Sequence, residues 1–144
     1  MFNKQGAKNG KQQAKARGTF VGTPLYCAPE MLENNQSGLF SDLWALGVII
    51  FEMSSGQKMF SGKNNKDIFD KIIKQEVFFP YCIDQSTCDI IEKLTNPDPQ
   101  MRLGLKNTAL LKQHPFFKEV DFEKIANQTC DMPKNTDVVD CMIS

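Results

Sequence analysis

The sequence predicts a mainly α-helical fold. Three observations support this class: a long apolar run at residues 43–51, further stretches whose apolar residues recur three and four positions apart, and almost no strand pattern outside residues 77–79. The chain has 144 residues, of which 41% are hydrophobic and 24% are charged, as in ordinary soluble globular proteins. That length favours a single domain.

The apolar run predicts the longest helix, from Ser41 to Ser55. Ser41 and Asp42 are residues of the kind that cap the start of a helix, and Gly56 is a usual stop. A buried strand is the alternative, but the segment is too long for one. Because residues 43–51 are apolar on every side, we expect this helix to lie in the centre of the domain and to be covered all round.

Three shorter helices follow. Residues 64–75 place apolar side chains on one stripe, with lysines and aspartates opposite, which predicts a surface helix. Ser86 and Asp89 have a capping-box-like spacing and predict the start of the next helix. Residues 108–113 predict a short helix that stops at His114. We expect three aromatic side chains beyond it to pack the following segment onto the core: Phe116, Phe117 and Phe122.

The charge distribution narrows the choice of partners. The formal net charge is zero, so the whole chain gives no electrostatic reason to expect nucleic acid or a membrane surface as its partner. Residues 1–18 are basic, which predicts a flexible arm; an arm that binds phosphate groups or an acidic partner is the alternative. Nothing in the sequence indicates an oligomeric state.

The five cysteines form no Cys-x-x-Cys pair, and no histidine cluster lies near them. We therefore expect neither a metal site nor a disulfide framework, and free thiols fit a reducing compartment. The longest apolar run is too short to span a bilayer, and no leader pattern opens the chain. A cytoplasmic protein is the expectation.

Four short motifs follow one another along the chain. They read GTFVGTPLYCAPE at residues 18–30, SDLWALG at 41–47, DPQMRLG at 98–104 and HPFF at 114–117. Together they resemble the large lobe of the serine/threonine protein kinases from the activation segment onward, over roughly residues 10–125. Three short motifs, at residues 16–23, 42–47 and 72–74, most resemble the phosphoinositide-dependent protein kinase within the AGC group.

The resemblance implies a partial kinase C-terminal lobe, made of the helices that follow the activation segment, with no N-terminal lobe. We expect residues 1–18 to be the basic flexible arm in the distal activation loop. Residues 19–125 are expected to form the partial lobe, and residues 126–144 a disordered tail. An intact enzyme of this family transfers a phosphoryl group from ATP, with Mg²⁺, to the Ser or Thr hydroxyls of protein substrates.

The resemblance also assigns roles around the first motif. Gly22, Thr23, Pro24 and Tyr26 match the surface that docks the substrate, where the backbone must be rigid: proline fixes φ and glycine permits turns that other residues resist. Thr23 matches the threonine that contacts the catalytic aspartate in kinases acting on Ser and Thr. Thr19 matches the activating phosphorylation site; an unmodified loop threonine is the alternative.

Structural roles follow from the later motifs. Glu30 and Arg102 match a buried ion pair of the family, with an ordinary surface glutamate as the alternative for Glu30. Asp42 matches the aspartate that holds the backbone of the catalytic loop, a role that can coexist with capping its own helix. Trp44 is expected in the core. His114 is expected to pack or to cap, and not to act as a base.

The parts that hold ATP and position the hydroxyl are missing from the sequence: Gly-x-Gly-x-x-Gly, His-Arg-Asp and Asp-Phe-Gly are all absent. We therefore expect no catalytic residue in this chain, and no binding of ATP or Mg²⁺ by it alone. The helix and catalytic loop that cover the central helix in the family are missing too, so we also expect much of residues 43–51 to be exposed. One hypothesis is a fragment of an active serine/threonine protein kinase. The other is a non-catalytic lobe remnant that acts as a protein-docking module. Thr23 and Asp42 favour the first, because the family uses both beside a catalytic loop that a bare lobe lacks.

Overall fold

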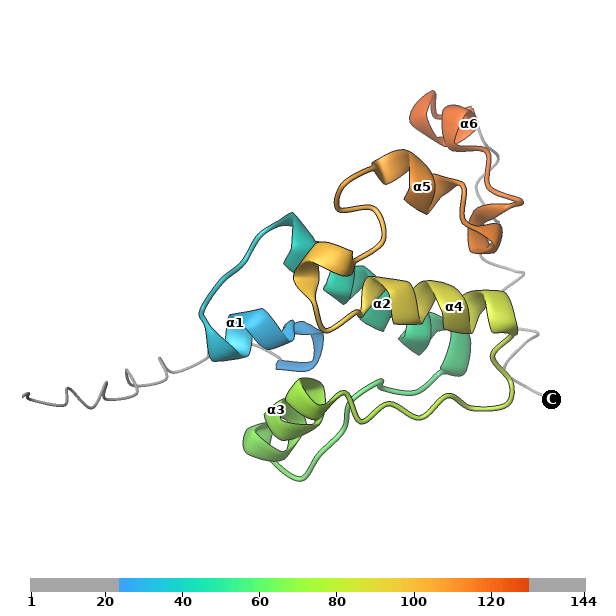
Figure 1. Cartoon of the computed structure of the whole chain (residues 1–144). Coiled ribbons are helices and arrows are strands. Elements are labelled where there is room, and N and C mark those ends of the chain that lie inside the picture. The colour runs from blue at the N-terminus through green and yellow to red at the C-terminus, as the bar shows by residue number, and fades with distance from the viewer. Residues whose placement is uncertain (1–23, 130–144) are drawn as a thin grey trace, which may run out of the picture.

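The computed structural model describes residues 24–129 (Figure 1). This part of the chain contains helices and no strand, residues 77–79 included, so the predicted mainly α class is confirmed. The α-helices are α1 (Pro29–Glu33), α2 (Leu39–Ser55), α3 (Asn65–Lys74), α4 (Gln85–Leu94), α5 (Thr108–Lys112) and α6 (Phe122–Ala126). The 3-10 helices are η1 (Pro24–Tyr26), η2 (Pro99–Met101) and η3 (Pro115–Phe117). The predicted basic arm at 1–18 and residues 130–144 of the predicted tail lie outside the described residues.

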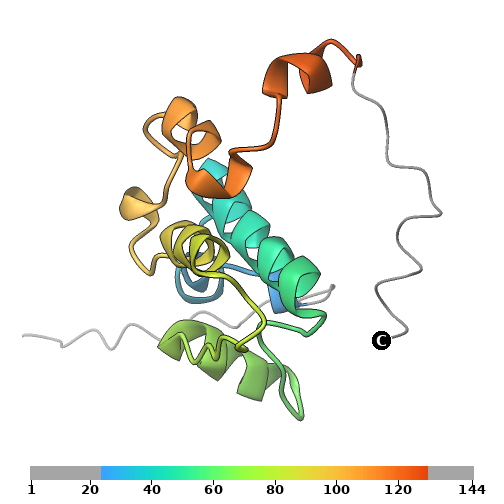
Figure 2. The same ribbon diagram turned by 90° about the vertical axis from the view of Figure 1, so that its right-hand side faces the viewer.

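Helix α2 is central, and α4 packs along it (Figures 1 and 2). Gly47 lies at their contact, where an added Cβ atom would stand 2.7 Å from Cγ2 of Thr95 and 3.0 Å from Cβ of Leu94. Only glycine fits such an approach without a shift of the neighbouring helix. Helix α3 packs against α1 and η1, and η1 also contacts α2. The packed helices α2 and α4 therefore form the centre of the domain, and η1 packs against α2.

The core surrounds Trp44 of α2, which is fully buried. Its indole ring stacks on Phe60, with 6.1 Å between the ring centroids and 4° between the planes. Two helical turns further on, Phe51 meets Phe79 edge-on at 5.8 Å. Further buried apolar side chains come from α2, α3 and α4: Val48, Ile72, Ile90, Ile91 and Leu94. Because each such burial contributes roughly 1.5–3 kcal/mol, this cluster holds the helices together.

One face of α2 is not covered, which corrects the prediction from its apolar run of a helix enclosed on all sides. The exposure expected for much of residues 43–51 holds only for Ile49. Ile49 is 44% exposed and Met53 is 81% exposed. These residues are four positions apart and so lie on the same face of the helix. No element between residues 24 and 129 packs over them. The opposite face carries the buried residues of the core.

Two helix starts differ from the prediction. Helix α2 begins at Leu39 after Gly38, so Ser41 and Asp42 lie in its first turn and do not cap it. Helix α4 is capped by Asp84, whose carboxylate accepts the backbone N–H groups of Ser86 and Thr87. The predicted Ser86–Asp89 capping box is therefore wrong: the cap lies two residues earlier, and the Ser86 hydroxyl donates to Asp84 Oδ1 at 2.6 Å.

The predicted helices at 64–75 and 108–113 are confirmed as α3 and α5. Beyond them the aromatic residues pack in a chain: Phe116 meets Phe117 edge-on at 4.8 Å, and Phe117 meets Phe122 at 5.5 Å. Phe116 and Phe117 pack against the core, while Phe122 reaches it only through Phe117. Figure 2 accordingly shows α6 standing away from the central helices.

Candidate functional site

The segment before α1 is shaped by two prolines. Pro24 opens η1 and Pro29 opens α1, where the fixed φ of proline suits the first helical position. Leu25 and Cys27 are buried, whereas Tyr26 between them is 38% exposed. Tyr26 therefore lies on the surface, while the buried side chains of Leu25 and Cys27 anchor the segment on either side of it.

A hydrogen bond joins Tyr26 to α2. The phenol donates to Oε2 of Glu52 at 2.8 Å. This hydrogen bond and the negative charge of Glu52 raise the pKa of Tyr26, because both favour the protonated phenol. The other carboxylate oxygen, Oε1, is buried and has no hydrogen-bond partner among residues 24–129. The pair thus places a carboxylate beside Tyr26, which belongs to the predicted docking surface.

Sequence reasoning missed Glu52. Apart from Asp42, it is the only charged residue between positions 41 and 55. A carboxylate within an otherwise apolar helix needs a polar partner, because burying it alone is costly. That isolated charge was the available signal, although it does not identify Tyr26 as the partner.

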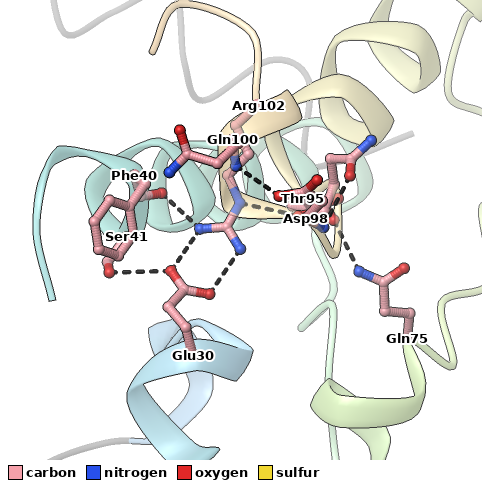
Figure 3. A network of polar contacts seen from close by, with 9 residues as sticks. Glu30, Phe40, Ser41, Gln75, Thr95, Asp98, Gln100 and Arg102 are labelled. Atoms are coloured by element: carbon pink, nitrogen blue, oxygen red, sulfur yellow. Dashed lines mark hydrogen bonds and ion pairs between the residues drawn. The ribbon is translucent and has the colours of Figure 1, made fainter. Parts of the chain in front are cut away.

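Glu30 and Arg102 form a buried ion pair across the lobe (Figure 3). Nη1 of Arg102 donates to Oε1 of Glu30 at 2.7 Å, and Nη2 donates to Oε2 at 2.8 Å. Arg102 is 2% exposed and Glu30 is 5% exposed. A bidentate arrangement of this kind is the strong form of the arginine–carboxylate contact. It ties α1 to the loop that follows η2.

The remaining donors and acceptors of the pair are also satisfied. Nη1 of Arg102 donates to the carbonyl of Phe40 at 2.7 Å, and Nε donates to the carbonyl of Asn96 at 3.0 Å. The Ser41 hydroxyl donates to Oε1 of Glu30 at 3.1 Å. A buried ion pair is tolerated only when its other hydrogen-bonding groups find partners, and here they do. Ser41, predicted as a cap, instead orients the Glu30 carboxylate.

The environment keeps Glu30 ionised. Burial raises the pKa of its carboxyl group, but the hydrogen bonds and charge of Arg102 outweigh burial, aided by the Glu30 backbone N–H and the Ser41 hydroxyl. The net effect is a pKa below the usual range for glutamate. The pair is therefore charged at neutral pH.

Local structure delivers Arg102 to this position. Asp98 caps η2 by accepting the backbone N–H of Gln100 at 2.9 Å, and Pro99 occupies the first helical position. After the turn, the backbone N–H of Leu103 donates to the carbonyl of Lys93 at 3.1 Å. The turn is therefore fixed at both ends, which points the guanidinium toward α1 (Figure 3).

Trp44 supports the same guanidinium from α2. The Arg102 carbon Cζ lies 5.1 Å from the centroid of the indole ring, within the range of a cation–π contact. The indole Nε1 is buried and has no acceptor within the described residues. Trp44 therefore contributes both to the core and to the ion-pair network.

Asp42 lies in the first turn of α2 and is exposed. No hydrogen bond or ion pair joins its side chain to another residue in the described range. Its charge is favourable near the N-terminus of the helix. Its carboxylate is therefore accessible in the described part of the chain, and its role toward a catalytic loop stays a prediction.

Other predicted site residues cannot be located. Thr19, Gly22 and Thr23 lie outside the described residues, and for Pro24 only the backbone is described. Of the predicted docking set, Tyr26 alone has a described side chain.

His114 has a structural environment. Its Nδ1 accepts the backbone N–H of Phe116 at 3.2 Å, which caps η3, and its Nε2 lies 2.8 Å from Oδ2 of Asp89. Because Nδ1 is an acceptor, the ring proton lies on Nε2, and this N–H group donates a hydrogen bond to Asp89. This His–Asp contact joins η3 to α4, and the cap on η3 agrees with the capping role expected for His114.

These observations define a class: a helical lobe in which a buried arginine binds the glutamate of an Ala-Pro-Glu segment and holds this segment against the central helix. The chain belongs to the protein kinase domain family, whose model matches residues 6–117. The fold and the buried pair are thus parts of a kinase domain.

Several protein kinases are similar to the chain. Protein kinase C epsilon type of Rattus norvegicus is 39% identical over 108 residues, which make up 72% of this chain and 15% of that protein. The RAC family serine/threonine-protein kinase homolog of Dictyostelium discoideum is 35% identical over 116 residues, 81% of this chain and 26% of that protein. Protein kinase C eta type of Homo sapiens is 35% identical over 133 residues, 90% of this chain and 19% of that protein. The chain thus spans between 15% and 26% of the length of these relatives.

Proposed function

We propose that this chain is the activation-segment end and the following helices of a serine/threonine protein kinase. In the intact enzyme it takes part in transfer of a phosphoryl group from ATP to Ser and Thr hydroxyls of protein substrates. The observation that carries the proposal is the buried pair of Glu30 and Arg102, which rigidly fixes the end of the predicted docking segment. Catalysis by positioning needs such rigidity, because small displacements of the substrate reduce the rate steeply.

The docking surface consists of Gly22, Thr23, Pro24 and Tyr26. Support comes from Tyr26, which is exposed and hydrogen-bonded to Glu52. Thr23 is assigned to contact the catalytic aspartate and so to favour Ser and Thr hydroxyls. Substitution by alanine removes that hydroxyl and should lower kcat of the intact enzyme more than it raises KM, whereas Thr23→Ser should retain activity.

Thr19 is the activating phosphorylation site in this proposal. A phosphate adds nearly two negative charges and can order the segment by pairing with arginine. Mass spectrometry of the active enzyme should find phosphate on Thr19, and Thr19→Ala should reduce activity. Full activity of Thr19→Ala would remove this part of the proposal.

Asp42 holds the catalytic loop of the intact kinase. Its outward-facing carboxylate and the absence of a partner among residues 24–129 support this role. Asp42→Asn should lower activity without unfolding the lobe, because the side chain makes no contact that the described fold needs.

We assign no ATP or Mg²⁺ site to the described residues. No group of three or more histidine, cysteine, aspartate or glutamate side chains within residues 24–129 could hold a metal ion. The nucleotide-binding and catalytic motifs are also absent from the sequence. We therefore expect no phosphoryl transfer by the isolated chain, and a turnover assay on the purified polypeptide tests this directly.

Within the family we place the chain in the AGC group, nearest the phosphoinositide-dependent protein kinase. The motifs at 16–23, 42–47 and 72–74 support that placement. A cytoplasmic location accords with the free thiols of Cys27, Cys82 and Cys88. No helix in the described range is long and apolar enough to cross a membrane.

The deciding experiment uses the full-length product of the transcript that contains this sequence. We would read the transcript for His-Arg-Asp and Asp-Phe-Gly in the same frame and measure phosphate transfer from ATP to protein Ser and Thr. Glu30→Gln should reduce that transfer, while Glu33→Gln, an exposed neighbour on α1, should not. A transcript without those motifs, or an inactive product, would contradict the kinase proposal and favour the alternative of a non-catalytic docking module.

A further inference from the structure

Helices α3 and α4 end side by side at a pocket of about 250 Å³. Its walls come from the helix ends and the two segments that leave them: Gln75, Val77, Phe79, Glu92, Thr95 and Pro97. Figure 3 shows Gln75 reaching from the end of α3 toward Thr95, and its Nε2 donates to the Thr95 carbonyl at 3.0 Å. The volume lies below the range of about 300–1,000 Å³ for small-molecule sites, so the pocket suits a single side chain.

The pocket is electronegative for two reasons. Gln75 and Thr95 are the C-caps of α3 and α4, so the negative ends of two helix dipoles meet there. The Glu92 carboxylate adds a full charge and makes no ion pair or hydrogen bond with any described residue. Nearby lysines are already paired: Lys74 with Glu76 at 3.9 Å and Lys93 with Asp89 at 2.7 Å. Glu92 is therefore the carboxylate left to attract an outside cation.

The rest of the wall suits an amphipathic side chain. Val77, Phe79 and Pro97 provide apolar surface for an aliphatic stem. The amide oxygen of Gln75 can accept a hydrogen bond, because its Nε2 is the atom that holds the Thr95 carbonyl. Acceptor groups and apolar surface thus lie in one small pocket.

We propose that this pocket binds an arginine side chain presented by a partner protein. A guanidinium is planar, weakly hydrated and rich in donors, so it can pair with Glu92 and bond to the Gln75 amide oxygen while its stem packs on the apolar wall. A lysine offers a compact, strongly hydrated charge and uses this geometry less well. The inference goes beyond phosphoryl transfer and does not depend on it.

The test uses the full ¹⁵N-labelled chain and three blocked amino acids. N-acetyl-arginine methylamide is titrated against its citrulline analogue, which keeps the shape but carries no charge, and against its lysine analogue. Arginine should shift the backbone amides of residues 75–79 and 92–96 in a saturable manner. Citrulline should bind at least about tenfold more weakly, the effect of losing one charge-assisted contact. Lysine should also bind more weakly, because its compact, strongly hydrated ammonium lacks the planar fork of donors that contacts Glu92 and the Gln75 amide together.

Glu92→Gln is the informative variant, because Glu92 is exposed and its replacement leaves the fold intact. It should weaken arginine binding about tenfold and leave citrulline binding unchanged. Glu123→Gln, the same change on α6, should bind arginine as the unaltered chain does. Equal binding of arginine and citrulline or lysine, no effect of Glu92→Gln, or no saturable shift at these amides would each overturn the proposal.

Discussion

Arg102 and Glu30 stand 72 positions apart in the sequence, yet their side chains form two hydrogen bonds of 2.7 and 2.8 Å in the interior. The guanidinium is satisfied on every side by carbonyls, the carboxylate and the Trp44 ring. One contact thus unites α1, α2 and the loop after η2. The position of the docking segment depends on it.

The first prediction concerns the stability of this pair. Glu30→Gln should lower the free energy of unfolding by about 3–5 kcal/mol, because it leaves the buried charge of Arg102 uncompensated. Urea unfolding followed by circular dichroism measures the change. Glu33→Gln is the matched control on the same helix and should change stability by no more than about 0.5 kcal/mol. Equal effects of the two substitutions would show that the pair is not buried as described.

The second prediction concerns acid unfolding. The folded state lowers the pKa of Glu30 below its unfolded value of about 4.3, so the unfolded chain binds more protons in that window and stability rises with pH. The contribution of Glu30 is present above about pH 4.3 and is lost as the pH falls through the folded pKa. Urea midpoints measured from pH 7 to pH 3 should fall less steeply for Glu30→Gln than for the unaltered chain.

The control for that experiment is again Glu33→Gln, which should keep the original slope. Some slope should persist in Glu30→Gln, because Asp84 and Asp89 also have lowered pKa values. Hydrogen bonds from Ser86 and Thr87 lower the first, and those from Lys93 and His114 lower the second. An unchanged slope in Glu30→Gln would contradict the assigned pKa direction.

Local patterns predicted most helices but not their starts. The apolar periodicity of α3 and the run in α2 depend on neighbours within a few residues, which a sequence reveals. The position of a cap depends on which polar side chain accepts hydrogen bonds from the free backbone N–H groups of the first turn. At α4 the carboxylate of Asp84 accepts the N–H groups of Ser86 and Thr87. At α2 the Ser41 hydroxyl instead donates to Glu30, 11 positions earlier and in another helix.

Contacts between distant residues left weaker signals. Spacing alone did not pair Glu30 with Arg102; only the resemblance to kinases suggested it. The bond between Tyr26 and Glu52 was missed, because nothing local to either residue names the other. The exposed face of α2 was expected only from the resemblance, because the elements that cover this helix in the family are missing, whereas its apolar run by itself predicted burial.

The third prediction concerns the phenol of Tyr26. The chain has two tyrosines, so Tyr81→Phe, a change at a fully exposed position, isolates Tyr26 for ultraviolet titration. In that background the pKa of Tyr26 should lie above the ordinary value of about 10. Adding Glu52→Gln should lower it toward that value, because the carboxylate that favours the protonated form is gone. An unchanged pKa of Tyr26 in Glu52→Gln would show that Glu52 does not accept a hydrogen bond from the phenol.

The last prediction concerns the close approach of α2 and α4 at Gly47. Gly47→Ala should destabilise the fold by about 1–3 kcal/mol, because the new methyl would lie 2.7 Å from Cγ2 of Thr95 and 3.0 Å from Cβ of Leu94. Thr95→Ser removes Cγ2 but keeps the hydroxyl that donates to the Ile91 carbonyl at 2.8 Å.

A double-mutant cycle separates this clash from the intrinsic preference of alanine for helices. Gly47→Ala should cost less in the Thr95→Ser background than in the unaltered chain, with a coupling of about 0.5 kcal/mol or more. If the effects of the two substitutions on the free energy of unfolding are additive, α2 and α4 move apart easily at Gly47. A coupling of the expected sign would instead show that the packing of α4 on the central helix is rigid, as a platform for the Glu30–Arg102 pair requires.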